Sequence, residues 1–482
     1  MRTKSDYDAI VVGSGPNGLV AAITLQHSGL AVLLVEGEKT IGGGLRSAEL
    51  TLPGFVHDVC SAVHPLAVCS PVFENLSLNR YGLEFIFPPV AAAHPFDDGS
   101  AAALYPSLEQ TAQSLGQDQH TYIRLMKPFL RDWSYLLDEI LSPVHFPKHP
   151  FPMARFGLTA LKSATHLAKR FQSKHAKGLW AGMASHSIRP LSSATTSSIA
   201  LVLMGAAHAK GWPVPKGGAA SIASALSSLF LSLGGKIETD FYVRSLEQLP
   251  SASALLFDIT PRQLLKIAGH RFSSIYKWQL ERFRYGMGVF KIDWALDGPI
   301  PFKAPLCMQA GTLHLGNTLE EIVASEQLTS EGHIPKNPFV LLAQQSLFDP
   351  TRTPEGKQIA WAYCHVPNGS KEDMTARIER QVERFAPGFR DRILARHTMN
   401  TSDIERYNPN YVGGDIAGGM MNIGQLFTRP ALRFSPYKTS ANRIYICSSS
   451  SPPGPGVHGM CGYHAAKKVL KDIFHKTPSI IQ

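Results

Sequence analysis

Several features are missing from this sequence of 482 residues, and each absence removes a class of protein. No stretch of about 20 apolar residues exists, so no transmembrane helix is predicted. The N-terminal residues, Met-Arg-Thr-Lys-Ser-Asp, lack the apolar core of a signal peptide. The six cysteines include no pair at Cys-x-x-Cys spacing, which disfavours a zinc site or a thioredoxin-type redox pair. A reducing compartment fits best, and we expect a cytoplasmic protein.

Charged residues are also scarce, at 17%, whereas hydrophobic residues make up 44%. This balance predicts a large core and excludes global disorder, and the length suits two or three domains. The net charge of +10 would suit nucleic acid, anionic lipid or an acidic ligand. No nucleic-acid partner is predicted, because neither an aromatic RNP pattern nor a zinc-finger spacing is present. No metal site is predicted either, since no Cys, His and carboxylate cluster has a ligand spacing.

Acidic residues are missing altogether between Leu141 and Ile237, although lysines and arginines occur throughout this segment. Residues 122–141 look helical, and residues 156–171 look like a basic amphipathic helix. A basic amphipathic helix can lie on an anionic membrane surface, where it would let a lipid-like substrate enter without crossing water. It can equally pack its apolar face into the core and leave its lysines solvated. Peripheral membrane contact is therefore one of two open interpretations.

The first 36 residues contain a complete nucleotide-binding pattern. Residues 8–12 are typical of a buried parallel strand, and a helix is predicted over 19–28. Between them the sequence reads Gly13-Ser-Gly15-Pro-Asn-Gly18, in which glycines permit a tight turn, a close approach to pyrophosphate and tight packing of helix on sheet. A second strand ends at Glu36, roughly 20 residues on, where a carboxylate can bind ribose hydroxyls.

The sequence after Glu36 separates the cofactor classes. It contains Gly42-Gly43-Gly44-Leu45-Arg46-Ser47, which resembles the Gly-Gly-Arg-x-x-Ser/Thr signature of the flavin amine oxidase and phytoene desaturase superfamily. Gly44 stands where many relatives have arginine, which puts the pyrophosphate contact in doubt but not the cofactor. The resemblance implies bound FAD, contact of Val243 with the adenine, and a Rossmann-like fold.

The resemblance returns near the end of the chain. Gly454-Pro-Gly456-Val457-His458-Gly459 is similar to the segment that passes beside the flavin ring in that superfamily. Glycines let a backbone approach a flat ring, and a following helix offers positive potential to reduced flavin. His458 is a candidate catalytic residue for proton transfer, or a loop histidine that bonds only to backbone. The predicted cofactor-binding residues are Gly13, Ser14, Gly15, Pro16, Asn17, Gly18, Glu36, Gly42, Gly43, Gly44, Leu45, Arg46, Val243, Ser449, Gly456, Val457 and His458.

Three further polar residues, His57, Asp58 and His64, follow the signature. Relatives place substrate-facing residues just after this point, although packing behind the site is the simpler interpretation.

We therefore predict an α/β flavoprotein of two discontinuous domains. Residues 1–85, 215–295 and 408–482 form the Rossmann-like FAD-binding domain. Residues 86–214 and 296–407 form a substrate domain with a mixed or antiparallel sheet and helices. The oligomeric state is left open.

The resemblance implies hydride transfer between a small apolar substrate, isoprenoid, polyene or lipid-like, and flavin N5, as in a phytoene desaturase or dehydrogenase of carotenoid type. The alternatives are a flavin-dependent saturase, an isomerase, an amine oxidase, or a non-catalytic protein that holds FAD for interactions.

Overall fold

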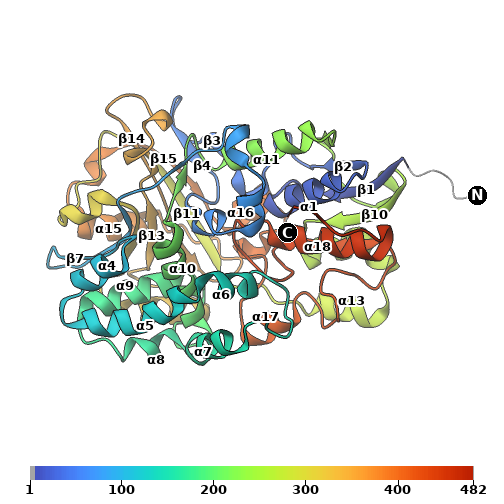
Figure 1. Cartoon of the computed structure of the whole chain (residues 1–482). Helices are drawn as coiled ribbons and strands as arrows, with labels where there is room; N and C mark the ends of the chain where they lie inside the picture. Colours follow the sequence, from blue (N-terminus) through green and yellow to red (C-terminus); the bar gives the residue numbers. More distant parts are fainter. Residues whose placement is uncertain (1–5, 481–482) are drawn as a thin grey trace, which may run out of the picture.

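Two β-sheets form the framework of the structure, a computed structural model that describes residues 6–480 (Figure 1). The first sheet has five parallel strands in the order β16-β10-β1-β2-β9. These strands come from the beginning, the middle and the end of the chain, so the sheet closes only when distant segments meet. They are β1 (Tyr7–Val12), β2 (Val32–Val35), β9 (Lys236–Glu238), β10 (Ala252–Phe257) and β16 (Ile444–Ile446).

Helices cover both faces of this sheet, as the nearly continuous apolar strands require. Ala9 and Val11 of β1 pack on one side with α1, α11 and α18, whereas Ile10 and Val12 pack on the other with α12 and α13. The helices are α1 (Pro16–His27), α11 (Ala220–Ser232), α12 (Pro261–Ala268), α13 (Ser274–Glu281) and α18 (Met460–Val469). The predicted strand–loop–helix–strand unit is therefore confirmed.

The second sheet has seven strands in the order β15-β11-β14-β13-β12-β6-β7. Neighbours are antiparallel except β12 and β6, which run parallel, so the sheet is mixed, as predicted. Its strands are β6 (Val90–Pro95), β7 (Ala101–Leu104), β11 (Gly288–Leu296), β12 (Ala310–Leu315), β13 (Val340–Ala343), β14 (Gln358–Val366) and β15 (Ile393–Met399).

Successive residues of β14 face opposite sides of this sheet. Ala360 and Ala362 pack into a core that includes α15, whereas Trp361 and Tyr363 join the large core that includes α9 and α10. Figure 1 shows α9 and α10 in front of the sheet. The helices around it are α9 (Lys174–Ser185), α10 (Thr196–Lys210), α14 (Leu319–Ser330) and α15 (Thr375–Phe385).

Short elements connect the two sheets. The antiparallel pairs are β3 (Ser47–Glu49) with β4 (Val56–Asp58), and β5 (Phe85–Ile86) with β8 (Val214–Pro215). The remaining helices are α2 (Pro65–Val68), α3 (Pro71–Asn75), α4 (Leu108–Ser114), α5 (Gln119–Arg131), α6 (Trp133–Ile140), α7 (Pro150–Ala160), α8 (Ala164–Ala168), α16 (Thr401–Tyr407) and α17 (Ile423–Thr428).

The structure differs from the sequence predictions in several details. The helix expected over residues 156–171 is divided between α7 and α8. The first helix begins at Pro16 rather than residue 19. Proline suits this first position because its φ is already helical and it has no backbone N–H that would need an acceptor. The predicted domain border at residue 295 falls inside β11, which pairs with β14 and β15 in the second sheet, so a border before residue 288 fits the strand pairing. The two-domain division itself stays a prediction.

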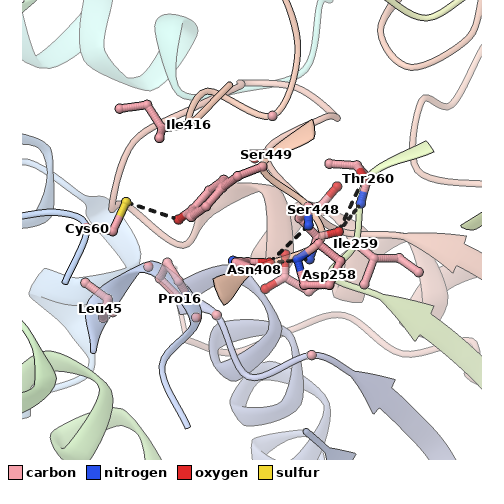
Figure 2. A pocket seen from close by; sticks show the side chains of 18 of the residues that line it. Pro16, Leu45, Cys60, Asp258, Ile259, Thr260, Asn408, Ile416, Ser448 and Ser449 are labelled. Atoms are coloured by element: carbon pink, nitrogen blue, oxygen red, sulfur yellow. Dashed lines mark hydrogen bonds between the residues drawn. The ribbon is translucent and has the colours of Figure 1, made fainter. Parts of the chain in front are cut away.

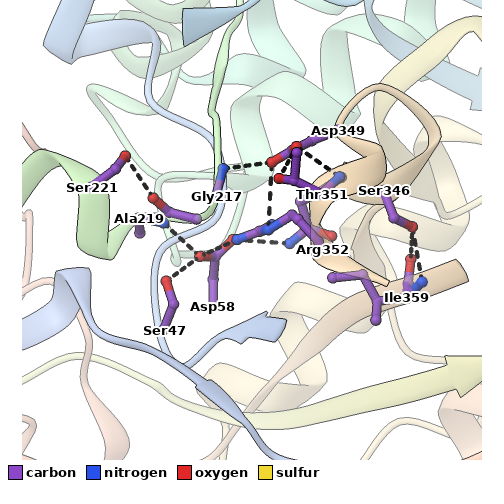
Figure 3. A network of polar contacts seen from close by, with 12 residues as sticks. Ser47, Asp58, Gly217, Ala219, Ser221, Ser346, Asp349, Thr351, Arg352 and Ile359 are labelled. Carbon is purple, nitrogen blue, oxygen red and sulfur yellow. Dashed lines mark hydrogen bonds and ion pairs between the residues drawn. The ribbon is translucent and has the colours of Figure 1, made fainter. Parts of the chain in front are cut away.

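A buried ion pair joins segments that are far apart in the sequence (Figure 3). Arg352 donates to Asp58 over 2.6 Å, and both side chains are fully buried. Asp58 also accepts from the backbone N–H of Ala219, and Asp349 accepts from that of Gly217. The network therefore fixes the entrance to α11 against the end of β4 and the loop that follows β13.

None of the helices in residues 6–480 is long and apolar enough to cross a membrane.

Candidate dinucleotide site and adjoining cavity

A cavity of about 550 Å³ lies where the carboxyl ends of β1, β2 and β10 meet the second sheet. Ligands of parallel α/β sheets bind at such edges. Figure 2 shows Pro16, Asp258 and Ser449 around this space. The predicted cofactor-binding residues that line it are Gly13, Ser14, Gly15, Pro16, Asn17, Glu36, Gly43, Gly44, Leu45, Arg46, Val243, Ser449, Gly456 and Val457.

The loop between β1 and α1 leaves no room for side chains. A Cβ on Gly15 would lie 2.6 Å from an Asp258 carboxylate oxygen, and one on Gly18 would lie 2.0 Å from the Gly13 carbonyl. Gly13 also has φ of +101°, which favours glycine. Gly18 does not line the cavity, and its role is this close packing. The first turn of α1 thereby faces the cavity with its positive dipole end, which suits a pyrophosphate.

Glu36 lies at the end of β2 and holds the same loop. One carboxylate oxygen accepts from the Ser14 backbone N–H at 2.9 Å and from its hydroxyl at 2.5 Å. The other accepts from the Glu38 N–H at 3.0 Å and from Arg46 at 3.3 Å. The Arg46 contact is the longest of the four and therefore the weakest. We expect a ribose hydroxyl to bind this second oxygen beside Arg46. Ribose binding by this carboxylate stays a prediction.

The second glycine cluster brings another loop against the first. Gly42 has φ of +114° and donates its N–H to the Ser14 hydroxyl, although it lies outside the cavity lining. A Cβ on Gly43 would lie 3.1 Å from the Gly15 Cα. A Cβ on Gly44 would lie 2.4 Å from the Tyr411 hydroxyl, so a larger residue there would require the Tyr411 side chain to move.

Residues 449–457 contribute to the lining of the cavity, but the side chain of His458 lies outside it. Ser449, Gly456 and Val457 line the cavity, whereas His458 does not. Its Nδ1 accepts from the Met460 N–H at 3.0 Å, and burial lowers the pKa of its ring to about 4. This geometry favours the second interpretation of His458, a loop histidine that forms hydrogen bonds only with the backbone. It gives no support to the predicted catalytic role.

Asp258 lines the cavity but is not among the predicted site residues. It follows β10 and accepts from the Gly18 N–H at 2.9 Å. Burial and the nearby Glu36 carboxylate raise the pKa of Asp258 to about 7, against the lowering effect of the Gly18 bond. The signal that could have revealed it is an acid directly after a buried apolar strand.

Tyr407 and Tyr411, at the end of α16 and just after it, were also missed. The Tyr407 hydroxyl donates to the Gly43 carbonyl at 2.8 Å, and the Arg46 guanidinium lies over the Tyr407 ring. Cys60 lies 3.4 Å from the Tyr411 hydroxyl, the bond drawn beside Cys60 in Figure 2. These two tyrosines therefore connect the glycine cluster with the far wall of the cavity.

The far wall is largely apolar and aromatic. Leu341 of β13, Trp361 and Tyr363 of β14, and Ile416 line it, and the Trp361 and Tyr363 rings meet edge to face at 5.2 Å. His186 is the histidine on this wall. No pattern in the sequence marked these residues, because strand pairing and helix packing bring them together.

The three polar residues after the second glycine cluster, His57, Asp58 and His64, do not line the cavity. Asp58 is paired with Arg352, and burial lowers the pKa of both His57 and His64 to about 4. This placement agrees with packing behind the site.

Comparisons with known proteins agree with this architecture. Residues 11–73 match the family described as NAD(P)-binding Rossmann-like domain. The chain is 24% identical to pyridine nucleotide-disulfide oxidoreductase domain-containing protein 2 of Mus musculus, over 98% of this chain and 94% of that protein.

Two bacterial relatives carry names of specific reactions. One of the limonene dehydrogenase subunits of Castellaniella defragrans is 21% identical, with 97% of this chain and 95% of that protein covered. The lycopene-forming phytoene desaturase of a Paracoccus species is 22% identical, with 94% and 95% covered.

The solved structure of putrescine oxidase with bound putrescine has the same fold, with a TM-score of 0.62, 14% identity, and 98% and 99% of the two chains covered. The chain is therefore an oxidoreductase with a Rossmann-like dinucleotide-binding domain, homologous over nearly its whole length to phytoene desaturase and to a component of limonene dehydrogenase.

Proposed function

We propose that this protein is an FAD-dependent oxidoreductase that moves hydride between an apolar, isoprenoid or lipid-like substrate and flavin N5. One observation carries the proposal: a single cavity joins the glycine cradle of α1 to the aromatic wall of the second sheet. A dinucleotide and an apolar molecule can therefore lie side by side in one cavity, as hydride transfer requires.

The residues present fit FAD. The first turn of α1 offers backbone N–H groups to the phosphates, and Glu36 offers a carboxylate to the ribose. The cavity continues along Arg46 to Val243 and along Ser449 to Val457, the segments that the family resemblance assigns to FAD. FAD supplies the hydride chemistry, and the chain supplies binding, orientation and exclusion of water.

Charge at the cavity favours an apolar substrate over an amine. The acids in its lining are Glu36, Glu38 and Asp258, and all three follow strands of the dinucleotide-binding sheet. The aromatic wall of Trp361 and Tyr363 has no carboxylate to pair with a substrate ammonium. The two bacterial relatives are named for limonene and phytoene, which supports an isoprenoid.

Desaturation is the favoured reaction, with saturation and isomerisation as the other flavin reactions of such a substrate. Apolar contacts on the wall would orient the carbon chain, and hydride transfer needs no strong protein acid or base. Product analysis separates the three, because isomerisation leaves the redox state of the substrate unchanged.

Purification with spectroscopy tests the cofactor, and anaerobic mixing tests the substrate class. We expect a yellow protein that releases FAD on denaturation, and loss of the oxidised-flavin absorption on mixing with a polyene or an isoprenoid. A colourless protein that rejects added FAD would overturn the flavin assignment. Bleaching by amines, but not by apolar compounds, would overturn the substrate class.

The chain also has a surface suited to a membrane. Phe151 and Leu158 lie on one face of α7 with 86% and 74% of their surfaces exposed, and the basic residues Lys148 and Lys162 lie just before and just after the helix. Exposed aromatic and aliphatic residues beside basic ones are typical of helices that rest in an anionic membrane surface. We infer peripheral contact through this helix, which would deliver an apolar substrate.

A further inference from the structure

The apolar wall of the cavity contains one imidazole that the proposed hydride transfer does not use. His186 directly follows α9 and lines the cavity, where its side chain is partly accessible. Its Nε2 lies 2.9 Å from Nε2 of His314 on β12, which is fully buried. Burying two imidazoles is unfavourable for folding, so this pair calls for a functional explanation.

Both rings are neutral at physiological pH. Burial lowers the pKa of His186 to about 3 and holds that of His314 well below its ordinary value. A neutral imidazole carries one N–H, so one ring of the pair donates through Nε2 and the other accepts. The choice of donor decides whether Nδ1 of each ring carries a proton and donates, or is bare and accepts.

The surroundings of His314, the fully buried ring, indicate which of the two rings donates. Nδ1 of His314 is enclosed and has no hydrogen-bond partner within residues 6–480. A buried N–H without a partner is rarer and less favourable than a bare acceptor, so the proton of His314 belongs on Nε2, where it donates to His186. His186 then accepts through Nε2 and carries its own proton on Nδ1. This tautomer follows from the bonding pattern rather than from observed hydrogens.

Nδ1 of His186 is the nitrogen left for a ligand. No described residue forms a hydrogen bond with this nitrogen, and the nitrogen is not fully enclosed by protein atoms. The same wall includes Leu341, Trp361 and Ile416, which offer no oxygen acceptor from their side chains, and Tyr363, whose hydroxyl is a second polar group there. The cavity therefore presents the His186 N–H donor, together with the Tyr363 hydroxyl, on a wall that is otherwise largely apolar. A metal is not the explanation, because residues 6–480 contain no group of three or more ligating side chains arranged for one.

We propose that the substrate is an apolar molecule that carries an oxygen acceptor, a hydroxyl or a carbonyl, and that His186 binds this oxygen through Nδ1–H. The inference rests on the proposed function, since it assigns the substrate class of the same cavity. The hydrogen bond fixes one end of a carbon chain that apolar contacts alone would let slide along the wall. His314 is a positioning residue, because it acts only by setting the tautomer of His186.

Matched ligands test the proposal on the FAD-loaded protein. The probes are geraniol and geranial, which carry an oxygen, and 2,6-dimethyl-2,6-octadiene, the hydrocarbon of the same skeleton. Binding is followed by the shift that each probe causes in the flavin absorption spectrum. We expect the oxygenated probes to bind about tenfold more tightly than the hydrocarbon, the gain of one hydrogen bond in an apolar site.

Two substitutions of His186 separate its donor from its ring. His186→Phe should abolish the preference for oxygen and keep the affinity for the hydrocarbon. His186→Asn, whose side-chain amide can donate from near the Nδ1 position, should retain part of the preference. His208→Phe is the matched control, because His208 is a histidine of α10 that bonds to Tyr122 and lies outside the cavity lining. It should leave the preference unchanged.

The outcomes distinguish this inference from the proposed function. Equal binding of all probes to the wild type would overturn the role of His186 and leave the apolar site intact. An unchanged preference in both His186 variants would also overturn that role. Failure of every probe to bind the FAD-loaded protein would overturn the apolar substrate class, and this inference with it.

Discussion

The Asp258 carboxylate accepts a hydrogen bond from the backbone N–H of Gly18, 2.9 Å away, in the first turn of α1. A negative side chain thus lies beside the N–H groups that would receive the phosphates of a dinucleotide. Two like charges this close disfavour each other, and a carboxyl group in that position responds by taking up a proton. Cofactor binding and the protonation of Asp258 are therefore linked.

The first prediction concerns the pH dependence of FAD binding. Asp258 has a pKa of about 7 in the free chain, where it faces Glu36 and the thiols of Cys447 and Cys461. Phosphates would raise this pKa further, so binding takes up a proton above pH 7 and none well below it. The FAD affinity should be flat at acidic pH and fall by up to about tenfold per pH unit above 7.

Isothermal titration in two buffers of different ionisation enthalpy measures this proton uptake directly. Asp258→Asn removes the titrating group, so its FAD affinity should lose the alkaline decline. Binding that is independent of pH in the wild type, without proton uptake, would contradict the linkage.

The second prediction concerns the glycine cradle. Gly15→Ala places a Cβ 2.6 Å from the Asp258 carboxylate, at the point where phosphates approach, and should weaken FAD binding at least about tenfold. Gly157→Ala is the matched control, because its Cβ would meet nothing within 4 Å. It should leave FAD binding unchanged and stabilise α7 slightly. Equal FAD affinities of the two variants, measured by fluorescence titration, would argue against a phosphate site at this loop.

The third prediction concerns the Asp58–Arg352 ion pair. Arg352→Met leaves two buried carboxylates, Asp58 and Asp349, without their cation and should lower the free energy of unfolding by about 3–5 kcal/mol. The double variant with Asp58→Asn should recover part of this loss, because it removes one of the unpaired charges. Lys216→Met removes the exposed pair with Glu84 and should change little. Denaturant unfolding checks the order of the four proteins, and a wild-type-like Arg352→Met would refute it.

The fourth prediction concerns α7. Phe151→Glu together with Leu158→Glu should abolish sedimentation of the protein with phosphatidylserine vesicles at low salt, since charge on the inserted face opposes burial in lipid. Ile275→Glu, at a position 72% exposed on α13, serves as the control and should still sediment. If the wild type stays in the supernatant, the membrane assignment of α7 is wrong.

The sequence predicted correctly the nucleotide-binding unit at the start of the chain, because neighbouring residues determine its structure. Strand β1, the glycine loop, α1 and β2 form a continuous pattern, and each glycine meets a specific steric limit in the structure. The expected helix over residues 122–141 contains a strong helical signal but divides at Asp132, which contacts Arg131 and Arg155. Such a break depends on tertiary partners that periodicity does not reveal.

The missed site residues share a different cause. Asp258, Tyr411 and His186 lie about 70 residues or more apart in the sequence, and no short motif contains any two of them. Their proximity to the cavity arises from the parallel pairing of β10 with β1 and from the packing of α9 on the second sheet. The catalytic role of His458 stays a prediction, and the direction of its ring is set by the turn into α18, which no short motif reveals.

The order of strands in the parallel sheet has a consequence for biosynthesis. While the ribosome has made only the cradle and α1, β1 lacks its neighbour β10, and the segment Ser448–Val457 does not yet exist. The cofactor site therefore cannot assemble on the emerging chain and must form after nearly all of it has been released. Until β10 has been made, the exposed edge of β1 is open to wrong partners.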